Sequence, residues 1–274
     1  MRTMLLLDSK ALLVVILLLT MPDHCQSVIL DHATATELSL YDDYLHILTL
    51  PTAVRLRGTD YSNIYVSDNG LIAFDSSFTT VGSELSNLVG SNKWLAPFGS
   101  DVVESPAAEL KHQTFNQGTE TAVVDAYVSG VFPDASFTAS VVYVITWLGV
   151  KKVADTTTAT NTFQLALATD GSQTFAAFLY DTIEWYPAVV GVGGGDGSVQ
   201  QVCYTNTLSA KHLPERSNSD NCGAEPGVIV FRIDDTSAWS TECKGVYTKP
   251  TTCTDQGTTH RPSVCSLRRR KKRR

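Results

Sequence analysis

Segments in which apolar and polar residues alternate constrain the fold of this chain more than any other feature of its sequence. The stretch NTFQLALATDG (161–171) carries its large apolar residues at every second position, the period of a strand with one buried face. Asp170-Gly171 then supplies a pair that tolerates the positive φ angles of a two-residue turn, and SQTFAAFLYD follows directly. This pattern predicts a β-hairpin in which Phe163 lies opposite Phe178, a cross-strand aromatic pair that fixes the register.

Similar short segments, separated by turn residues, recur along most of the chain. No window has clear helical periodicity, except for a turn or two within GSELSNLVG (82–90), and residues 28–50 are expected to hold one strand or a loose leader. Many short strands at regular spacing predict an all-β fold, either an antiparallel β-sandwich or an irregular barrel with little helix. The clearest predicted strands are two around the turn at 68–70 and those at 121–132, 140–150, 161–169 and 227–235.

The first 27 residues have the organisation of a secretory signal peptide. Arg2 and Lys10 flank a short polar start, ALLVVILLLTM (11–21) forms an apolar core, and Cys25 and Ser27 are the small residues of a cleavage site after Ser27. The alternative is an uncleaved signal anchor, but a spanning helix needs roughly 18 or more apolar residues, and this run has 11. The sequence therefore predicts a secreted, extracellular chain with no transmembrane segment after cleavage.

The remainder divides by composition into three parts. We expect an N-terminal leader over residues 28–44, a β domain over 45–235, and a cysteine-containing linker with a basic tail over 236–274.

Charge is distributed unevenly between the body and the C-terminal end. Residues 28–267 hold 12 lysines and arginines against 26 aspartates and glutamates, a balance of −14. Two interpretations of the basic end stay open: a proprotein-convertase cleavage site, or an anchor for sulphated glycosaminoglycans through counterion release. A nuclear-localisation motif conflicts with the signal peptide, so we expect no nucleic-acid partner. The basic tail consists of Arg268, Arg269, Arg270, Lys271, Lys272, Arg273 and Arg274.

The cysteines are those of a secreted chain. In an oxidising compartment they are candidates for disulfide bonds, and we expect Cys203 and Cys222, which bracket one loop-rich stretch, to pair. The three cysteines nearest the C-terminus, at 243, 253 and 265, then leave one thiol over, for an intermolecular bond or a truncated neighbouring module. A zinc site is disfavoured because no CxxC motif is present. The five cysteines that remain after signal cleavage are Cys203, Cys222, Cys243, Cys253 and Cys265.

Known catalytic motifs are missing from the sequence. It contains no GxSxG elbow, HExxH motif, P-loop or EF-hand loop. GVGGGDG (191–197) does not match GxGxxG, because position 196 is aspartate, and we interpret it as a flexible turn after a strand. We therefore expect no enzyme and no catalytic site. The histidines at positions 32, 46, 112, 212 and 260 share no spacing.

Three aspartates leave one alternative open for a cofactor. Asp101, Asp170 and Asp196 occupy turns at which oxygen ligands for calcium could converge. Turn carboxylates usually cap backbone amides instead, so we expect no cofactor and keep calcium binding as the alternative.

Several of these segments together resemble the NIDO domain, the extracellular module of nidogen, alpha-tectorin and some membrane mucins. The resemblance covers roughly residues 45–235 in the order of the family, with Gly99 at a position where the family usually has tryptophan. It implies an adhesion or matrix protein rather than an enzyme, and it carries over no binding residues. The matching stretches are NTFQLALATDGSQTFAAFLY (161–180), YSNIYVSDNGLIAF (61–74), LAPFGSDV (95–102), VVYVITWLGV (141–150), GGDG (194–197) and PGVIVFRID (226–234).

From these features we expect a secreted, non-catalytic module that mediates matrix or cell-surface protein interactions, as in cell–matrix adhesion. NIDO modules usually stand beside EGF-like, AMOP or von Willebrand modules, and no complete module of these kinds flanks this one. The alternative is a secreted hydrolase or a carbohydrate- or calcium-binding domain that uses acidic turns and exposed aromatic residues such as Trp185 and Tyr186.

Overall fold

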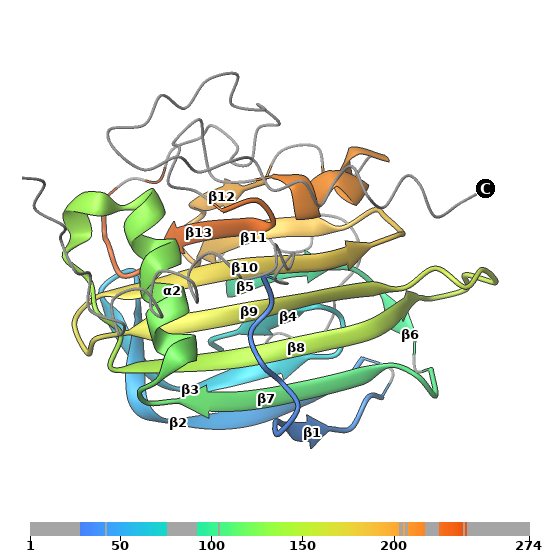
Figure 1. Cartoon of the computed structure of the whole chain (residues 1–274), viewed down its shortest axis with the longest axis horizontal. Coiled ribbons are helices and arrows are strands. Elements are labelled where there is room, and N and C mark those ends of the chain that lie inside the picture. The colour runs from blue at the N-terminus through green and yellow to red at the C-terminus, as the bar shows by residue number, and fades with distance from the viewer. Residues whose placement is uncertain are drawn as a thin grey trace, which may run out of the picture. The chain divides into compact units, whose positions relative to one another are not determined.

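Two antiparallel sheets make up the fold of the chain (Figure 1). The computed structural model describes residues 28–41, 43–75, 92–103, 105–202, 205, 208–216, 225–237 and 239. Within these ranges the sheets do not close into a barrel, so the prediction of an all-β fold is confirmed in its sandwich form.

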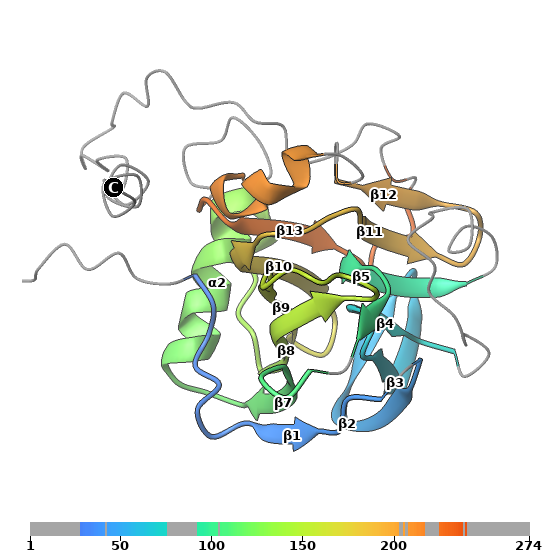
Figure 2. The same ribbon diagram turned by 90° about the vertical axis from the view of Figure 1, so that its right-hand side faces the viewer.

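Sheet A and sheet B each have an unbroken strand order (Figures 1 and 2). Sheet A runs β1 (Thr36–Leu38), β7 (Glu109–Phe115), β8 (Val141–Lys152), β9 (Asn161–Thr169), β10 (Thr174–Ile183) and β13 (Val228–Arg232), and β6 (Val102–Val103) pairs with β8. Sheet B runs β12 (Val199–Gln201), β11 (Val189–Gly194), β5 (Lys93–Gly99), β4 (Leu71–Ala73), β3 (Thr59–Ser67) and β2 (Leu45–Leu56).

The space between the sheets is filled by one apolar core with a chain of aromatic rings at its centre. Trp147 stacks on Phe163 with ring centroids 5.2 Å apart, and Phe98 of the opposite sheet lies 5.4 Å from Phe163. Trp185 meets Phe98 edge to face at 5.1 Å. Buried aromatic pairs in such geometry stabilise a core beyond their area alone, so these rings tie the two sheets together.

The hairpin predicted at β9 and β10 is present, but its register differs from the prediction. Thr169 pairs with Thr174, so the loop has four residues, and Phe163 lies opposite Tyr180 rather than Phe178. The reason is local hydrogen bonding: the Asp170 carboxylate accepts from the N–H groups of residues 172 and 173 at 2.7 and 2.6 Å. An aspartate that caps two turn amides stabilises the longer loop.

The segment predicted as a strand at 121–132 is instead the helix α2 (Thr119–Val131). Its buried residues are Thr121, Val124 and Val128, which share one face of a helix because residues three and four apart lie together. Valine-rich composition favours a strand on propensity, but this stripe packs on the outer face of sheet A. Tertiary packing therefore decided the element type. Two short 3-10 helices, η2 (Pro133–Ala135) and η3 (Leu208–Glu215), complete the helical content of the described chain.

Strand β9 is consequently buried on both faces rather than one. Its phenylalanine and leucines point into the core between the sheets, whereas Ala166 and Ala168 share an apolar cluster with Val124 and Val128 of α2. Alanine side chains are small, so the helix can lie close to the sheet.

No helix in the described ranges combines the length and the apolar character needed to cross a membrane.

The N-terminal residues of the described chain take part in the fold. Leu30 is buried beside α2 and the outer face of sheet A, and β1 extends this sheet by pairing with β7. The chain then passes from sheet A to sheet B and enters β2 (Figure 2). Residues 28–50, expected to hold one strand or a loose leader, thus contain β1 and the first part of β2.

The glycine-rich stretch at 191–197 is not simply a flexible turn. Its first four residues complete strand β11, which lies between β5 and β12. A Cβ atom at Gly193 would overlap the indole of Trp94, and one at Gly191 would overlap the backbone of Gln200. Close packing against a neighbouring strand therefore explains the glycines, and only residues 195–198 form a turn.

Candidate functional site

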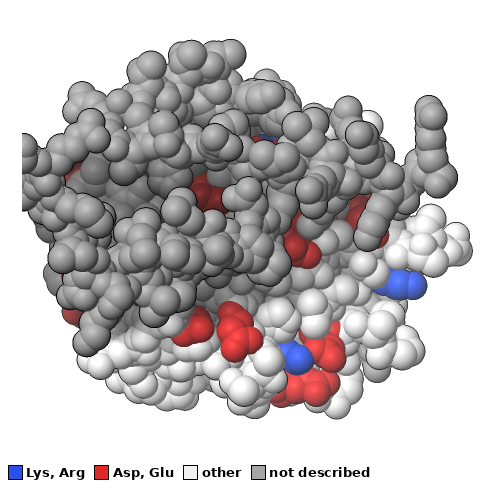
Figure 3. All heavy atoms as spheres, in the orientation of Figure 1, with Lys and Arg blue, Asp and Glu red and all other residues white. Residues whose placement is uncertain are grey.

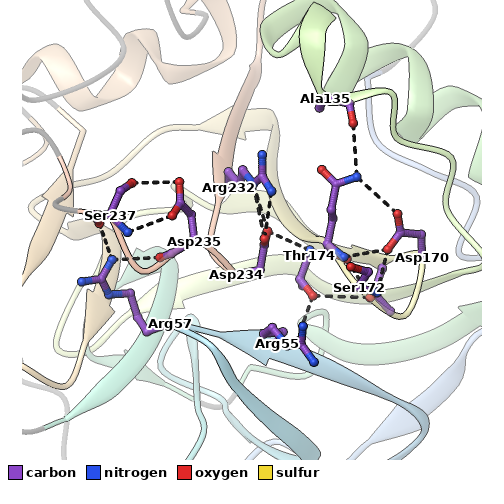
Figure 4. A network of polar contacts seen from close by, with 12 residues as sticks. Arg55, Arg57, Ala135, Asp170, Ser172, Thr174, Arg232, Asp234, Asp235 and Ser237 are labelled. Carbon is purple, nitrogen blue, oxygen red and sulfur yellow. Dashed lines mark hydrogen bonds and ion pairs between the residues drawn. The ribbon is translucent and has the colours of Figure 1, made fainter.

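A polar network joins the two sheets where β10, β13 and β2 meet (Figure 4). The Asp234 carboxylate accepts from the Thr174 N–H at 3.0 Å and from the Arg232 guanidinium at 3.1 Å. The Thr174 hydroxyl accepts from the N–H of Arg55 in β2 at 2.9 Å. The polar groups of Asp234, Thr174 and Arg232 thus bind one another and the backbone. This arrangement favours a structural role for the closing stretch of the domain, residues 226–234.

Arg57 holds the chain that leaves the domain (Figure 4). Its guanidinium donates to the carbonyl oxygens of Asp235 and Ser237 and to the Asp196 carboxylate, the last at 3.1 Å. Its charged end also lies 5.0 Å from the centroid of the Trp239 ring, within the range of a cation–π interaction. Asp235, Ser237 and Trp239 are thus held against the β2–β3 turn.

The three aspartates considered for calcium do not form a metal site. In the described chain, no group of three or more histidine, cysteine, aspartate or glutamate residues is placed to hold a metal ion. Asp170 caps the β9–β10 turn, and Asp196 accepts from the backbone and hydroxyl of Ser198. These contacts, with Arg57, hold the pKa of Asp196 well below its usual range. The backbone carbonyl of Asp101 accepts from Val153.

The turn between β3 and β4 is buried, which is unusual for a loop. The Asn69 carboxamide donates to Asp43 at 2.7 Å and accepts from the Val102 N–H at 2.8 Å. A Cβ atom at Gly70 would overlap the Phe98 carbonyl, and its φ of 75° favours glycine. Burial raises the pKa of Asp68 to about 6, although hydrogen bonds from Tyr44, Asn69 and Ser67 oppose the shift. The turn therefore has a structural role: it joins β3 to β4 and binds the chain at Asp43 and Val102.

The aromatic residues proposed for carbohydrate binding are not an exposed pair. Trp185 is buried, its indole N–H donates to the Val150 carbonyl at 3.0 Å, and Asn161 caps its backbone. Tyr186 is half-buried, with the Lys211 ammonium 5.8 Å from its ring centroid. The prediction that Trp185 is exposed is wrong, because this tryptophan completes the aromatic chain between the sheets.

Exposed aromatic residues lie instead where the chain passes from β1 to β2. Tyr41 and Tyr44 are 54% and 48% exposed, and their rings meet edge to face at 5.4 Å. Tyr44 also contacts the His46 ring at 4.8 Å. We call Tyr41, Tyr44 and His46 the tyrosine patch. Asp43, held by Asn69, lies between the two tyrosines in the chain and is exposed.

The patch has the chemistry of a protein-contact surface. Tyrosine is enriched at binding hot spots because a rigid amphipathic ring buries large area at low entropic cost. The other exposed large apolar residues, Ile47 and Leu208, are 65% and 61% exposed. Ile47 follows His46 on β2 and so points to the opposite face of that strand, and Leu208 begins η3. Of the described surface, only the patch combines adjacent exposed aromatic rings.

Acidic side chains predominate over basic ones on the visible described surface (Figure 3), in keeping with the charge of the body. His112 on β7 lies near His46, and burial together with the charge of His46 lowers the pKa of His112.

Several predicted features fall outside the described residues. These are the signal peptide with Ser27, all five cysteines, the helical turn at 82–90 and the basic tail. Sequence analysis missed the tyrosine patch, because residues 28–44 were interpreted as a leader. The sequence YDDY (41–44), in which two tyrosines flank two aspartates, was the available signal.

The model of the nidogen-like domain family matches residues 62–235. Alpha-tectorin of Gallus gallus is 33% identical over 138 residues, which is 50% of this chain and 6% of that protein. Nidogen of Drosophila melanogaster is 27% identical over 205 residues, covering 68% of this chain and 15% of its own length. Nidogen-1 of Mus musculus is 26% identical over 204 residues, 64% and 16% of the two chains. The chain spans only a small part of these relatives, and no solved structure matches it.

Proposed function

Because the chain belongs to the nidogen-like domain family, we propose that it is an extracellular, non-catalytic module that binds a matrix or cell-surface protein through the tyrosine patch. The family and the relatives, alpha-tectorin and nidogen, support a matrix-associated module. We choose this surface because the rings of Tyr41 and Tyr44 are exposed and contact each other.

The hydrogen bonds of three motifs of the domain agree with a non-catalytic role. The closing stretch, the buried turn at 68–70 and the acidic turns all bind their own backbone or each other. These hydrogen bonds stabilise turns and the contact between the sheets, as turn carboxylates commonly do. The exposed tyrosine rings are the part of the described surface best suited to binding.

The test is binding of the purified secreted protein to extracellular matrix and to cell surfaces at micromolar concentration. The double variant Tyr41→Ala/Tyr44→Ala is expected to weaken binding at least tenfold while the thermal midpoint stays within a few degrees, because both rings are exposed. Leu208→Ala removes another exposed apolar side chain and serves as the matched control. Binding that survives in the double variant would exclude the patch, and absence of any binding by the unaltered protein would refute the proposed function.

For the basic tail we propose an accessory role, either as a processing site or as an anchor for sulphated glycosaminoglycans. Seven adjacent cations next to an acidic body support both. The intact mass of the secreted protein, before and after reduction, separates them: a mass that lacks residues 268–274 indicates processing. The same measurement tests cleavage after Ser27 and counts the disulfide bonds, and peptide mapping of the unreduced protein then tests the expected Cys203–Cys222 bond. If the tail is retained, heparin affinity that falls steeply with salt and disappears on removal of the tail supports the anchor.

A further inference from the structure

The buried turn between β3 and β4 holds the tyrosine patch in one conformation. Asp43 has a φ of 57°, in the left-handed region that aspartate, asparagine and glycine adopt more readily than other residues. The buried Asn69 carboxamide donates to Oδ1 of Asp43 at 2.7 Å. The Tyr44 N–H donates to the Asp68 carboxylate at 3.4 Å, and the Asp68 N–H donates to the Tyr44 carbonyl at the same distance. A surface fixed in this way loses little conformational entropy when a partner binds.

The same contacts bring two carboxylates close together without a cation. Asn69 binds the Asp43 carboxylate, and the next residue in the chain, Tyr44, binds the carboxylate of Asp68. Neither aspartate forms an ion pair within the described part of the chain, and Oδ2 of the exposed Asp43 has no hydrogen-bond partner there. Residues 28–54 contain no lysine or arginine. A cation from outside the domain would therefore offset an electrostatic cost that the fold leaves in place.

We propose that the tyrosine patch binds an arginine side chain presented by a basic segment of a partner protein. The guanidinium stacks on an exposed ring face of Tyr41 or Tyr44 and donates to Oδ2 of Asp43. Arginine suits this surface better than lysine, because a planar guanidinium can stack on an aromatic ring and donate in its own plane at once. The acidic side chains that predominate on the visible surface (Figure 3) would attract a basic partner. This inference rests on the proposed binding role of the patch and adds the chemistry of the partner.

The experiment compares two peptides of equal charge, hexa-arginine and hexa-lysine, in calorimetric titrations of the full secreted chain at physiological ionic strength. Hexa-arginine should bind with a dissociation constant in the micromolar range. It should bind at least about threefold more tightly than hexa-lysine, whose ammonium groups are more strongly hydrated and cannot stack. The same titrations of a chain without residues 268–274 show whether the basic tail competes for the surface.

Three variants separate recognition by the patch from attraction by net charge. Tyr41→Ala/Tyr44→Ala should weaken hexa-arginine binding at least about fivefold and abolish the preference over hexa-lysine. Asp43→Asn should weaken it about threefold, since asparagine keeps the left-handed conformation and can still accept from Asn69. Asp134→Asn removes the same charge from an exposed aspartate in η2, and it should change the affinity by less than about 1.5-fold.

Three results would overturn the proposal. Equal affinity for the two peptides, or equal losses in Asp43→Asn and Asp134→Asn, would show that binding depends on net charge alone. Binding of hexa-arginine only after removal of residues 268–274 would assign the surface to the chain's own tail instead of a partner. Matrix binding that needs both tyrosine rings, without any preference for hexa-arginine, would keep the proposed function and refute this inference. Absence of matrix binding refutes the proposed function whatever the peptides do.

Discussion

Replacement of Gln164 by leucine should destabilise the domain by removing the attachment of its N-terminal segment. Leucine has a similar volume and no polar atoms, so the packing beside α2 is kept while three hydrogen bonds are lost, to the N–H and carbonyl of Leu30 and to the Thr146 hydroxyl. Each is worth about 1 kcal/mol net, and release of the buried Leu30 side chain forfeits up to about 2 kcal/mol more. The expected loss is about 2–4 kcal/mol, because the two effects overlap.

Chemical denaturation with linear extrapolation measures this loss, and the thermal midpoint should fall by about 5 to 10 °C for a domain of this size. Gln113→Leu is a matched control, since Gln113 binds the same segment through a single exposed hydrogen bond to Thr34; it should cost less than about 1 kcal/mol. A second comparison uses a chain that begins at Asp31. Because both changes release the same contacts, Gln164→Leu should have little further effect in that chain. A loss below about 0.5 kcal/mol, or full additivity with the truncation, would refute the structural role of Gln164.

Three further predictions concern packing, pH and the exit of the chain. Gly193→Ala should lower the free energy of unfolding by about 1–3 kcal/mol, because the new methyl group overlaps the Trp94 indole. In combination with Trp94→Phe, the loss measured by denaturation should be smaller than the sum of the losses of the two single variants. Additive losses would contradict the packing explanation. Asp68 has a pKa raised to about 6 in the folded state, above its value of 3.8 when unfolded, so the folded state binds the extra proton and stability falls as pH rises from about 4 to about 6. Asp68→Asn should therefore stabilise the domain at pH 7, by at most about 3 kcal/mol, and have little effect at pH 4; a pH profile of the midpoint that the substitution leaves unchanged would be inconsistent with this account. Arg57→Ala should lower stability by about 2 kcal/mol and speed amide exchange at residues 235–237, because the guanidinium binds the carbonyl groups of Asp235 and Ser237. Exchange at the β9–β10 turn should stay as it was. Equal protection at residues 235–237 in both proteins would argue against this role of Arg57.

Two-residue periodicity identified the fold class because it reports burial on a single face of a strand. It placed β9, β10, the pair around 68–70 and the closing strand correctly, and the motifs of these segments carried the family resemblance that the family comparison confirmed. The two-residue period gave the wrong element type for α2, which packs on the outer face of sheet A. This segment has the valine content of a strand, but it forms a helix whose apolar side packs on Ala166 and Ala168. The periodicity also misjudged the hairpin register, since the Asp170 side chain set the loop length through contacts that a residue pattern does not contain.

The same contrast between local sequence pattern and tertiary packing applies to the candidate binding surface. The sequence by itself determined that the chain is acidic and β-rich, that it has the motifs of the nidogen-like domain family and a run of seven basic residues, and that it contains no known catalytic motif. Only the tertiary structure decided which aromatic residues are exposed, because burial depends on neighbours that are distant in the chain. Trp185 is covered by Phe98 of the opposite sheet, whereas Tyr41 and Tyr44 lie on a crossing between sheets that no other described element covers. Local periodicity fixes which face of a strand is apolar, and the meeting of remote segments fixes which side chains remain free to bind.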